Sequence, residues 1–133
     1  MAGLRSTLPV GFTMGDAAGI GPEIIVKTFA AGLQSPAIVY GDVGVMQNTV
    51  YELGYEGQLR VEIISEPEAC SGDPHVIPVL NRWQPLPDNL PMGQPNAEAG
   101  RGAYEYLCHA IDDAMAQRIR AIVTAPLNKK AMQ

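Results

Sequence analysis

The sequence contains few of the side chains from which metal centres, disulfides and nucleic-acid-binding surfaces are built. Its 133 residues include only two histidines and two cysteines, and the formal net charge is −5. A catalytic divalent ion normally needs about three protein ligands, so we predict no metal site within this chain. Nucleic-acid-binding surfaces are basic, and the absence of a lysine or arginine cluster argues against nucleic acid as a partner.

The histidines and cysteines are also poorly placed to act together. His75 lies in a proline-rich stretch, while His109 follows Cys108 on a predicted helix, where neighbours project about 100° apart. Cys70 and Cys108 are far apart in sequence and form no C-x-x-C pair, so two free thiols are expected.

Long apolar runs and a secretory signal are missing as well. No run approaches the length needed to span a bilayer, and the first nine residues lack the apolar core of a signal peptide. We therefore expect a cytoplasmic protein without membrane attachment. With 47% hydrophobic and 17% charged residues, the chain has the composition of a folded globular protein.

The most informative segment is a glycine-rich loop between the first predicted strand, residues 10–14, and the first predicted helix. Pro22 suits the first turn of that helix, because its missing N–H needs no partner there. Gly15, Gly19 and Gly21 would let the backbone approach a ligand, and free N–H groups at the helix start favour an anion. The spacing matches neither the dinucleotide nor the P-loop fingerprint. A loop that binds nothing is therefore the alternative interpretation.

Strands and helices alternate along the chain, which is typical of a mainly parallel sheet with helices on both faces. Strands are predicted at residues 10–14, 37–40, 59–64, 76–80 and 119–125, and helices at 22–31, 43–53 and from Ala97 onward.

The side-chain pattern predicts which face of each element is buried. We expect the inward residues to be Ile24, Ile25, Thr28 and Phe29 of the first helix, Val61 and Ile63 of the third strand, and Ala103, Leu107, Ala110, Ile111 and Ala114 of the last helix. Arg60, Glu62, Asp112 and Asp113 are expected to face solvent.

Seven of the eleven prolines fall between Pro67 and Pro95. Proline removes a backbone donor and fixes φ, so residues 67–96 are predicted to form an irregular, proline-rich excursion over the surface. Residues 76–80 can still form a short strand, which Pro78 would keep at an edge or a bulge. The excursion is either a stiff loop or a segment that reaches toward a partner subunit.

Active sites of open parallel sheets lie beyond the carboxyl ends of the strands, so the first loop and the segment after the last strand should share one edge. There Asp16 could accept hydrogen bonds or bind a cation, and Lys129 could bind phosphate or carboxylate or transfer a proton. Thr124 and Asn128 could contact substrate oxygens. Each also has an ordinary alternative, as a turn cap, a strand end or a solvated lysine.

Three segments, in this order, resemble motifs of the 4-hydroxythreonine-4-phosphate dehydrogenase family. They are residues 14–23 (MGDAAGIGPE), 93–104 (GQPNAEAGRGAY) and 123–129 (VTAPLNK), so the resemblance covers nearly the whole chain. Ala17 replaces the usual proline of the first motif, and Asn96 stands where serine is common in the second.

The resemblance implies an isocitrate/isopropylmalate dehydrogenase-like α/β fold and a homodimeric, metal-dependent enzyme. Such enzymes use NAD to oxidise, with decarboxylation, a phosphorylated hydroxy acid such as 4-phosphooxy-threonine in pyridoxal phosphate biosynthesis; relatives act on phospho-threonate or phospho-erythronate. The positions that match the family's cleft motifs are Asp16, Gly19, Gly21, Thr124, Asn128 and Lys129, with Lys129 the catalytic candidate. The family's metal ligands (for Zn, Mg or Co) and most of its cofactor contacts lie further along the chain than Gln133.

Residues 1–133 are therefore interpreted as the N-terminal portion of a two-domain dehydrogenase, an incomplete part of the fold that is inactive alone. A non-catalytic fragment that binds an anion or another subunit is the alternative. An incomplete sheet would also leave unpaired edges and apolar faces exposed, which predicts association.

Overall fold

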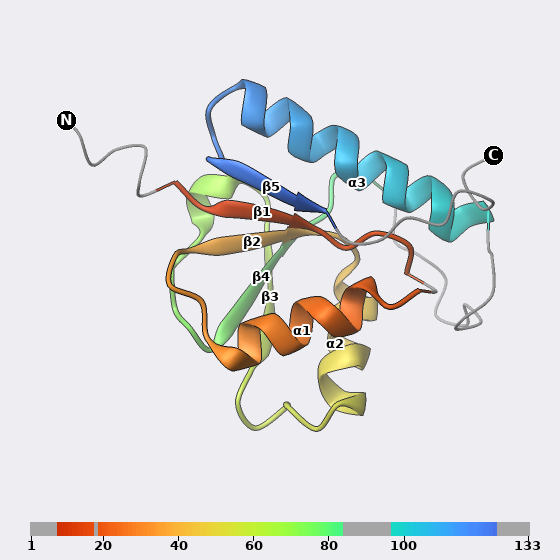
Figure 1. The fold of residues 1–133 in the computed structure, drawn as a ribbon, viewed down its shortest axis with the longest axis vertical. Coiled ribbons are helices and arrows are strands. Elements are labelled where there is room, and N and C mark those ends of the chain that lie inside the picture. Colours follow the sequence, from red (N-terminus) through yellow and green to blue (C-terminus); the bar gives the residue numbers. More distant parts are fainter. Residues whose placement is uncertain (1–7, 18, 84–96, 125–133) are drawn as a thin grey trace.

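The computed structural model describes residues 8–17, 19–83 and 97–124 (Figure 1). Its elements, in chain order, are β1 (Val10–Thr13), α1 (Gly21–Ala31), β2 (Ala37–Tyr40), α2 (Val43–Glu52), β3 (Arg60–Ile64), the 3-10 turn η2 (Pro67–Ala69), β4 (Val76–Leu80), α3 (Ala97–Met115) and β5 (Ala121–Thr124). The predicted elements are confirmed, with boundaries that shift by one or two residues.

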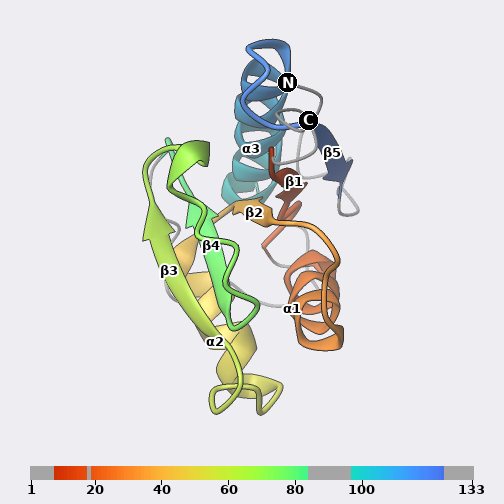
Figure 2. The same cartoon turned by 90° about the vertical axis from the view of Figure 1, so that its left-hand side faces the viewer.

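The five strands form one parallel sheet in the order β3-β4-β2-β1-β5. Helices α1 and α2 lie on one side of this sheet and α3 on the other (Figures 1 and 2). The predicted α/β architecture with helices on both faces is therefore confirmed. No helix in the described part of the chain is both long and apolar enough to cross a membrane.

The central strands β2 and β4 are buried along their whole length. Both are short, continuous apolar runs, as expected of strands with a neighbour on either side. Helix α1 starts with Pro22 in its first turn and ends at Gly32, whose φ of 97° favours glycine. Asp42 caps α2, because its carboxylate accepts a hydrogen bond of 3.0 Å from the N–H of Val45.

Strand β4 lies between β3 and β2, so the expectation that Pro78 keeps it at an edge or a bulge is wrong. Its ladder to β3 spans all five residues of the strand, but its ladder to β2 contains only Val39–Val79 and Tyr40–Leu80. Pairing with β2 thus begins one residue after Pro78, so the missing N–H interrupts no bond on that side. Within the predicted excursion, residues 76–80 are therefore part of the core, residues 68–75 are exposed or half-buried at the surface as predicted, and residues 84–96 lie outside the described residues.

Several predicted inward residues are buried, but three isoleucines are not. Ile25, Phe29, Ala103 and Ala110 are buried, whereas the exposed fractions are 44% for Ile24, 71% for Ile63 and 44% for Ile111. Thr28, Val61, Leu107 and Ala114 are half-buried. The sheet face of α1 carries Val26 in place of Ile24. Ile63 lies on an edge strand, and Ile111 lies on a flank of α3 that turns away from the sheet.

Asp113 also departs from the prediction, because it is only 3% exposed. Its Oδ2 accepts hydrogen bonds from the Tyr40 hydroxyl at 2.5 Å and from Arg82 Nη1 at 2.8 Å. Its Oδ1 accepts from Arg118 Nη1 at 3.4 Å, and Arg118 also pairs with Glu66 and Glu68. A buried carboxylate is stable only when it is paired and hydrogen-bonded, and here two arginines meet that need.

This network ties α3 to the sheet and to the segments that follow β3 and β4. Burial, followed by the hydrogen bond to the Asp113 carboxylate, raises the pKa of Tyr40 far above its usual value, so the hydroxyl remains a donor.

The close approach of Gly41 to Met14 gives a test of this packing. A Cβ at position 41 would lie 2.7 Å from Met14 Cβ, so Gly41→Ala should lower the free energy of unfolding by about 1–3 kcal/mol. The matched control is Gly57→Ala, which meets no atom within 4 Å and has no left-handed φ. It should be neutral or stabilise by up to about 1 kcal/mol. Chemical denaturation of both variants measures the difference, and equal midpoints would contradict the packing described here.

Candidate functional site at the carboxyl edge of the sheet

Four strands end side by side at one edge of the sheet. In the parallel register Thr124 of β5 pairs with Thr13 of β1, Thr13 with Tyr40 of β2, and Tyr40 with Leu80 of β4. The loops that follow these residues therefore leave the sheet together. The predicted meeting of the first loop with the end of the last strand is confirmed for Thr124, which is exposed there.

The loop after β1 turns sharply at its first glycine. Met14 N–H donates to the Tyr40 carbonyl at 2.9 Å, and Gly15 then adopts a φ of 73°, which side chains disfavour. Gly19 N–H closes the turn by donating to the Asp16 carbonyl at 2.9 Å. Of the three loop glycines, Gly15 alone has a left-handed backbone; Gly19 and Gly21 are not left-handed.

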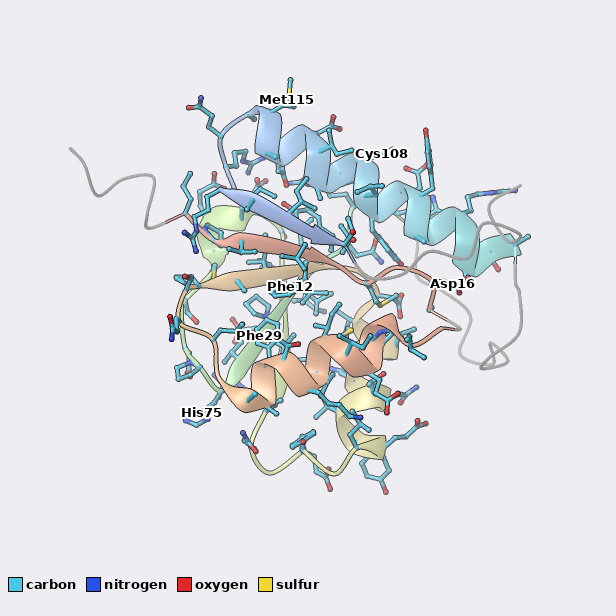
Figure 3. The ribbon with its side chains drawn as sticks, in the orientation of Figure 1. Phe12, Asp16, Phe29, His75, Cys108 and Met115 are labelled. Atoms are coloured by element: carbon cyan, nitrogen blue, oxygen red, sulfur yellow. The ribbon has the colours of Figure 1, made fainter. Side chains whose placement is uncertain are left out.

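The Asp16 side chain lies between the end of β1 and the start of α1 (Figure 3) and is 2% exposed. The positive end of α1 follows a few residues later, at Gly21. A carboxylate here can accept hydrogen bonds from a hydroxyl or ammonium group. This placement agrees with a role in a cleft, and equally with the alternative that Asp16 orders the loop.

A second set of buried groups at this edge was not predicted. Asp42, 5% exposed, follows β2, and its N–H lies 3.5 Å from the Met14 sulfur. Tyr106 of α3 is 1% exposed, and its pKa is raised by burial and then by the negative charge of Asp42. The Trp83 ring meets the Tyr106 ring edge-on at 6.4 Å. A Cβ at Gly102 would lie 3.0 Å from the Trp83 ring, so a small residue is needed there.

The signal for part of this set was present in the sequence. An aspartate directly after an apolar strand and before a helix, as in Gly41-Asp42-Val43, marks an N-cap at the carboxyl edge. Nothing in the sequence pattern separates Tyr106, which is buried, from Tyr104, which is 53% exposed.

Two buried hydroxyls at this edge, those of Thr13 and Tyr106, have no hydrogen-bond partner in the part of the chain that the structure describes. Burying a hydroxyl without a partner costs about 1–3 kcal/mol.

A metal centre does not fit the described residues, since no group of three or more His, Cys, Asp or Glu side chains is placed to hold an ion among them. Nε2 of His109 lies 3.8 Å from Oε2 of Glu105, one turn away on α3. His75 lies at the end of the sheet that is opposite the carboxyl edge (Figure 3). Cys70 and Cys108 are free thiols, as predicted. Asn96, Asn128 and Lys129 lie outside the described residues.

The described residues also form a cavity of about 140 Å³, but it opens at the other edge of the sheet. Its lining includes Pro36 and Ala37 at the start of β2 and Val76 at the start of β4. This cavity is therefore separate from the candidate site.

Fold and site together define a parallel α/β protein with a candidate ligand cleft beyond the carboxyl ends of its strands. The chain belongs to the family of the pyridoxal phosphate biosynthetic protein PdxA, whose sequence model matches residues 33–133.

Among its relatives, the D-threonate 4-phosphate dehydrogenase of Pectobacterium atrosepticum is 39% identical in an alignment of 125 residues that covers 92% of this chain and 38% of the relative. The enzyme of the same name from Cupriavidus necator is 38% identical, over 94% of this chain and 38% of the relative. The crystal structure of a 4-hydroxythreonine-4-phosphate dehydrogenase from Burkholderia phymatum superimposes with a TM-score of 0.83 at 37% identity, covering 94% of this chain and 38% of that one. The chain thus spans a little over a third of the length of these relatives.

The two buried tyrosines near this edge give a paired test. Tyr40→Phe removes a hydrogen bond to a carboxylate and should lower the free energy of unfolding by about 1.5–3 kcal/mol. Tyr106→Phe removes a hydroxyl without a partner among the described residues and should leave stability unchanged or raise it. Denaturant unfolding of both variants is the measurement. A similar loss of stability in the two variants would contradict the finding that, among the described residues, the Tyr40 hydroxyl has a hydrogen-bond partner and the Tyr106 hydroxyl does not.

Proposed function

We propose that residues 1–133 form the N-terminal side of the substrate cleft in an NAD-dependent, metal-dependent dehydrogenase of phosphorylated hydroxy acids. The observation that supports this most directly is the register Thr13–Thr124. This register brings the glycine-rich loop, which contains the first family motif, next to β5, the strand in which the third family motif begins. The chain itself belongs to this family.

We propose D-threonate 4-phosphate as the substrate, because the two curated relatives described above carry that name. The alternative is 4-hydroxythreonine 4-phosphate, the substrate named for the Burkholderia phymatum structure. The two molecules differ only at C2, which bears a hydroxyl in the first and an ammonium group in the second. Ala17, which is buried in the loop, departs from the family motif, and this departure favours D-threonate 4-phosphate as the substrate.

The proposed reaction oxidises the secondary alcohol at C3. The C–H bond transfers hydride to NAD, the hydroxyl proton leaves to a base, and the product is a ketone β to the carboxylate. Loss of carbon dioxide and protonation of the resulting enolate give a three-carbon hydroxyketone phosphate. NAD, when bound, supplies the hydride acceptor.

Within this scheme, the chain's own residues bind and orient the substrate. Asp16 would accept a hydrogen bond from the C2 substituent, and the backbone at Gly19 and Gly21 would let the substrate approach the start of α1. Thr124 and Asn128 would contact substrate oxygens. Lys129 would bind the phosphate or carboxylate, or hold the proton that moves at C3.

The divalent ion of this proposal (Zn, Mg or Co) would be bound by residues outside this chain, since the described residues do not fit a metal centre. A homodimer is likewise proposed from the family resemblance.

The substrate proposal is tested with the full-length parent protein, supplied with NAD, a divalent ion and each phosphorylated acid in turn. NADH absorbance should rise faster with D-threonate 4-phosphate than with 4-hydroxythreonine 4-phosphate. A chelator should abolish the increase in absorbance. The reverse preference would identify the alternative substrate. Turnover by the 133-residue chain alone would refute the proposal that it supplies only one side of the site.

The role of Asp16 is tested by Asp16→Asn in the same parent. Loss of a charge-assisted hydrogen bond should lower kcat/KM about 10- to 100-fold, while the unfolding midpoint changes little. Glu52→Gln, at an exposed position on α2, is the matched control and should retain full activity. A variant that keeps its activity but loses stability would show that Asp16 only orders the loop.

A further inference from the structure

Helix α3 carries a second apolar face besides the one that packs on the sheet. The buried face includes Ala103, Tyr106 and Ala110. About 150° around the helix, at 100° per residue, lies a row that we name the α3 stripe: Tyr104, Cys108, Ile111 and Met115. The exposed fractions are 53% for Tyr104, 44% for Ile111 and 81% for Met115, and Cys108 is half-exposed.

The α3 stripe lies on the solvent side of α3, next to the flank that is opposite Asp113. On one flank of α3, Asp113 bonds to Tyr40, so that flank faces β2. On the opposite flank, Leu107 and Ala114 join the buried face to the α3 stripe. In Figure 3, Met115 points away from the sheet.

The described sheet is also open at β5, a strand that α3 contacts. β5 ends the strand order and, among the described strands, pairs only with β1. Val123 is 45% exposed, although it is the register partner of Phe12. An apolar edge strand with free backbone groups favours the addition of another strand.

The handedness of the fold indicates where a helix beyond β5 would lie. The chain steps from β1 through β2 to β3 with α1 and α2 on one face, then returns from β4 to β5 with α3 on the other (Figure 1). A further parallel strand outside β5 would continue the direction of that return. Because such crossovers are right-handed, its connecting helix would lie on the face of α3, about 8–10 Å from it.

We propose that the α3 stripe is the docking surface for the helix that follows β5 in a polypeptide of the relatives' length, a segment that starts near Pro126. The relatives are long enough to contain such a segment, since residues 1–133 match only 38% of their length. In the sequence, the apolar residues Leu127 and Ala131 are about one helical turn apart, and the apolar Met132 follows them. A second copy fits less well, because four side chains on one helix fall short of the roughly 800 Å² per partner of a stable dimer.

The test compares two exposed apolar positions in the full-length parent. Met115→Lys should lower the unfolding temperature by about 5 °C or more, because it places a charge against the docked helix. Tyr51→Lys, on α2, is the matched control. Tyr51 is 71% exposed against 81% for Met115, and the variant should shift the temperature by less than about 1 °C. Equal tolerance of both substitutions would overturn the inference.

Thiol alkylation, followed by peptide mapping, gives an independent readout. In the parent, Cys108 should react about 10-fold more slowly than in the 133-residue chain, while Cys70, away from the α3 stripe, should change little. Equal rates for Cys108 would overturn the proposal. Protection that disappears on dilution would also overturn it, because a second copy would then be the occupant. Neither readout measures catalysis, so this inference and the proposed function can fail separately.

Discussion

The candidate cleft depends on the parallel register of the sheet. Because Thr124, Thr13, Tyr40 and Leu80 are successive partners across four strands, the segments after them start from one line. The left-handed turn at Gly15 then directs the first loop back over this edge toward α1. A shift of one residue in any of these ladders would reverse the faces of a strand and separate groups that now lie together.

Tyr40 links the carboxyl edge of the sheet to α3, the helix on the face opposite α1 and α2. Its backbone pairs within the sheet, and its hydroxyl reaches the buried carboxylate of Asp113 on α3. Arg82 and Arg118 balance the charge of that carboxylate. The same contacts fix how far along the sheet α3 lies, and so place Tyr106 against Trp83 beside the carboxyl edge. Buried, well-connected polar groups thus position a helix that apolar packing alone would hold less specifically.

Much of the fold could be predicted from local pattern. Alternating strands and helices, Pro22 at a helix start and Gly32 at a helix end each reflect the chemistry of a few neighbouring residues. Errors arose where a residue's environment comes from distant segments. Pro78 lies in an inner strand because the ladder with β2 starts after it, and Asp113 is buried because arginines from two other segments reach it. Of the candidate site, Asp16 and Thr124 could be located in advance, and the position of Asp42 as an N-cap could have been, whereas Tyr106 became recognisable only when α3 was placed against β2.

The alternation of elements, the glycine-rich turn after the first strand and the resemblance to one family can be read from the amino-acid sequence, because these features depend on residues close together in the chain. The identity of the central strands, the covered side of α3 and the buried carboxylates emerge only in the folded protein. Those properties depend on strand order and on pairing between residues far apart in sequence, such as Tyr40 with Asp113. The free energy of such contacts exists only once the sheet has assembled.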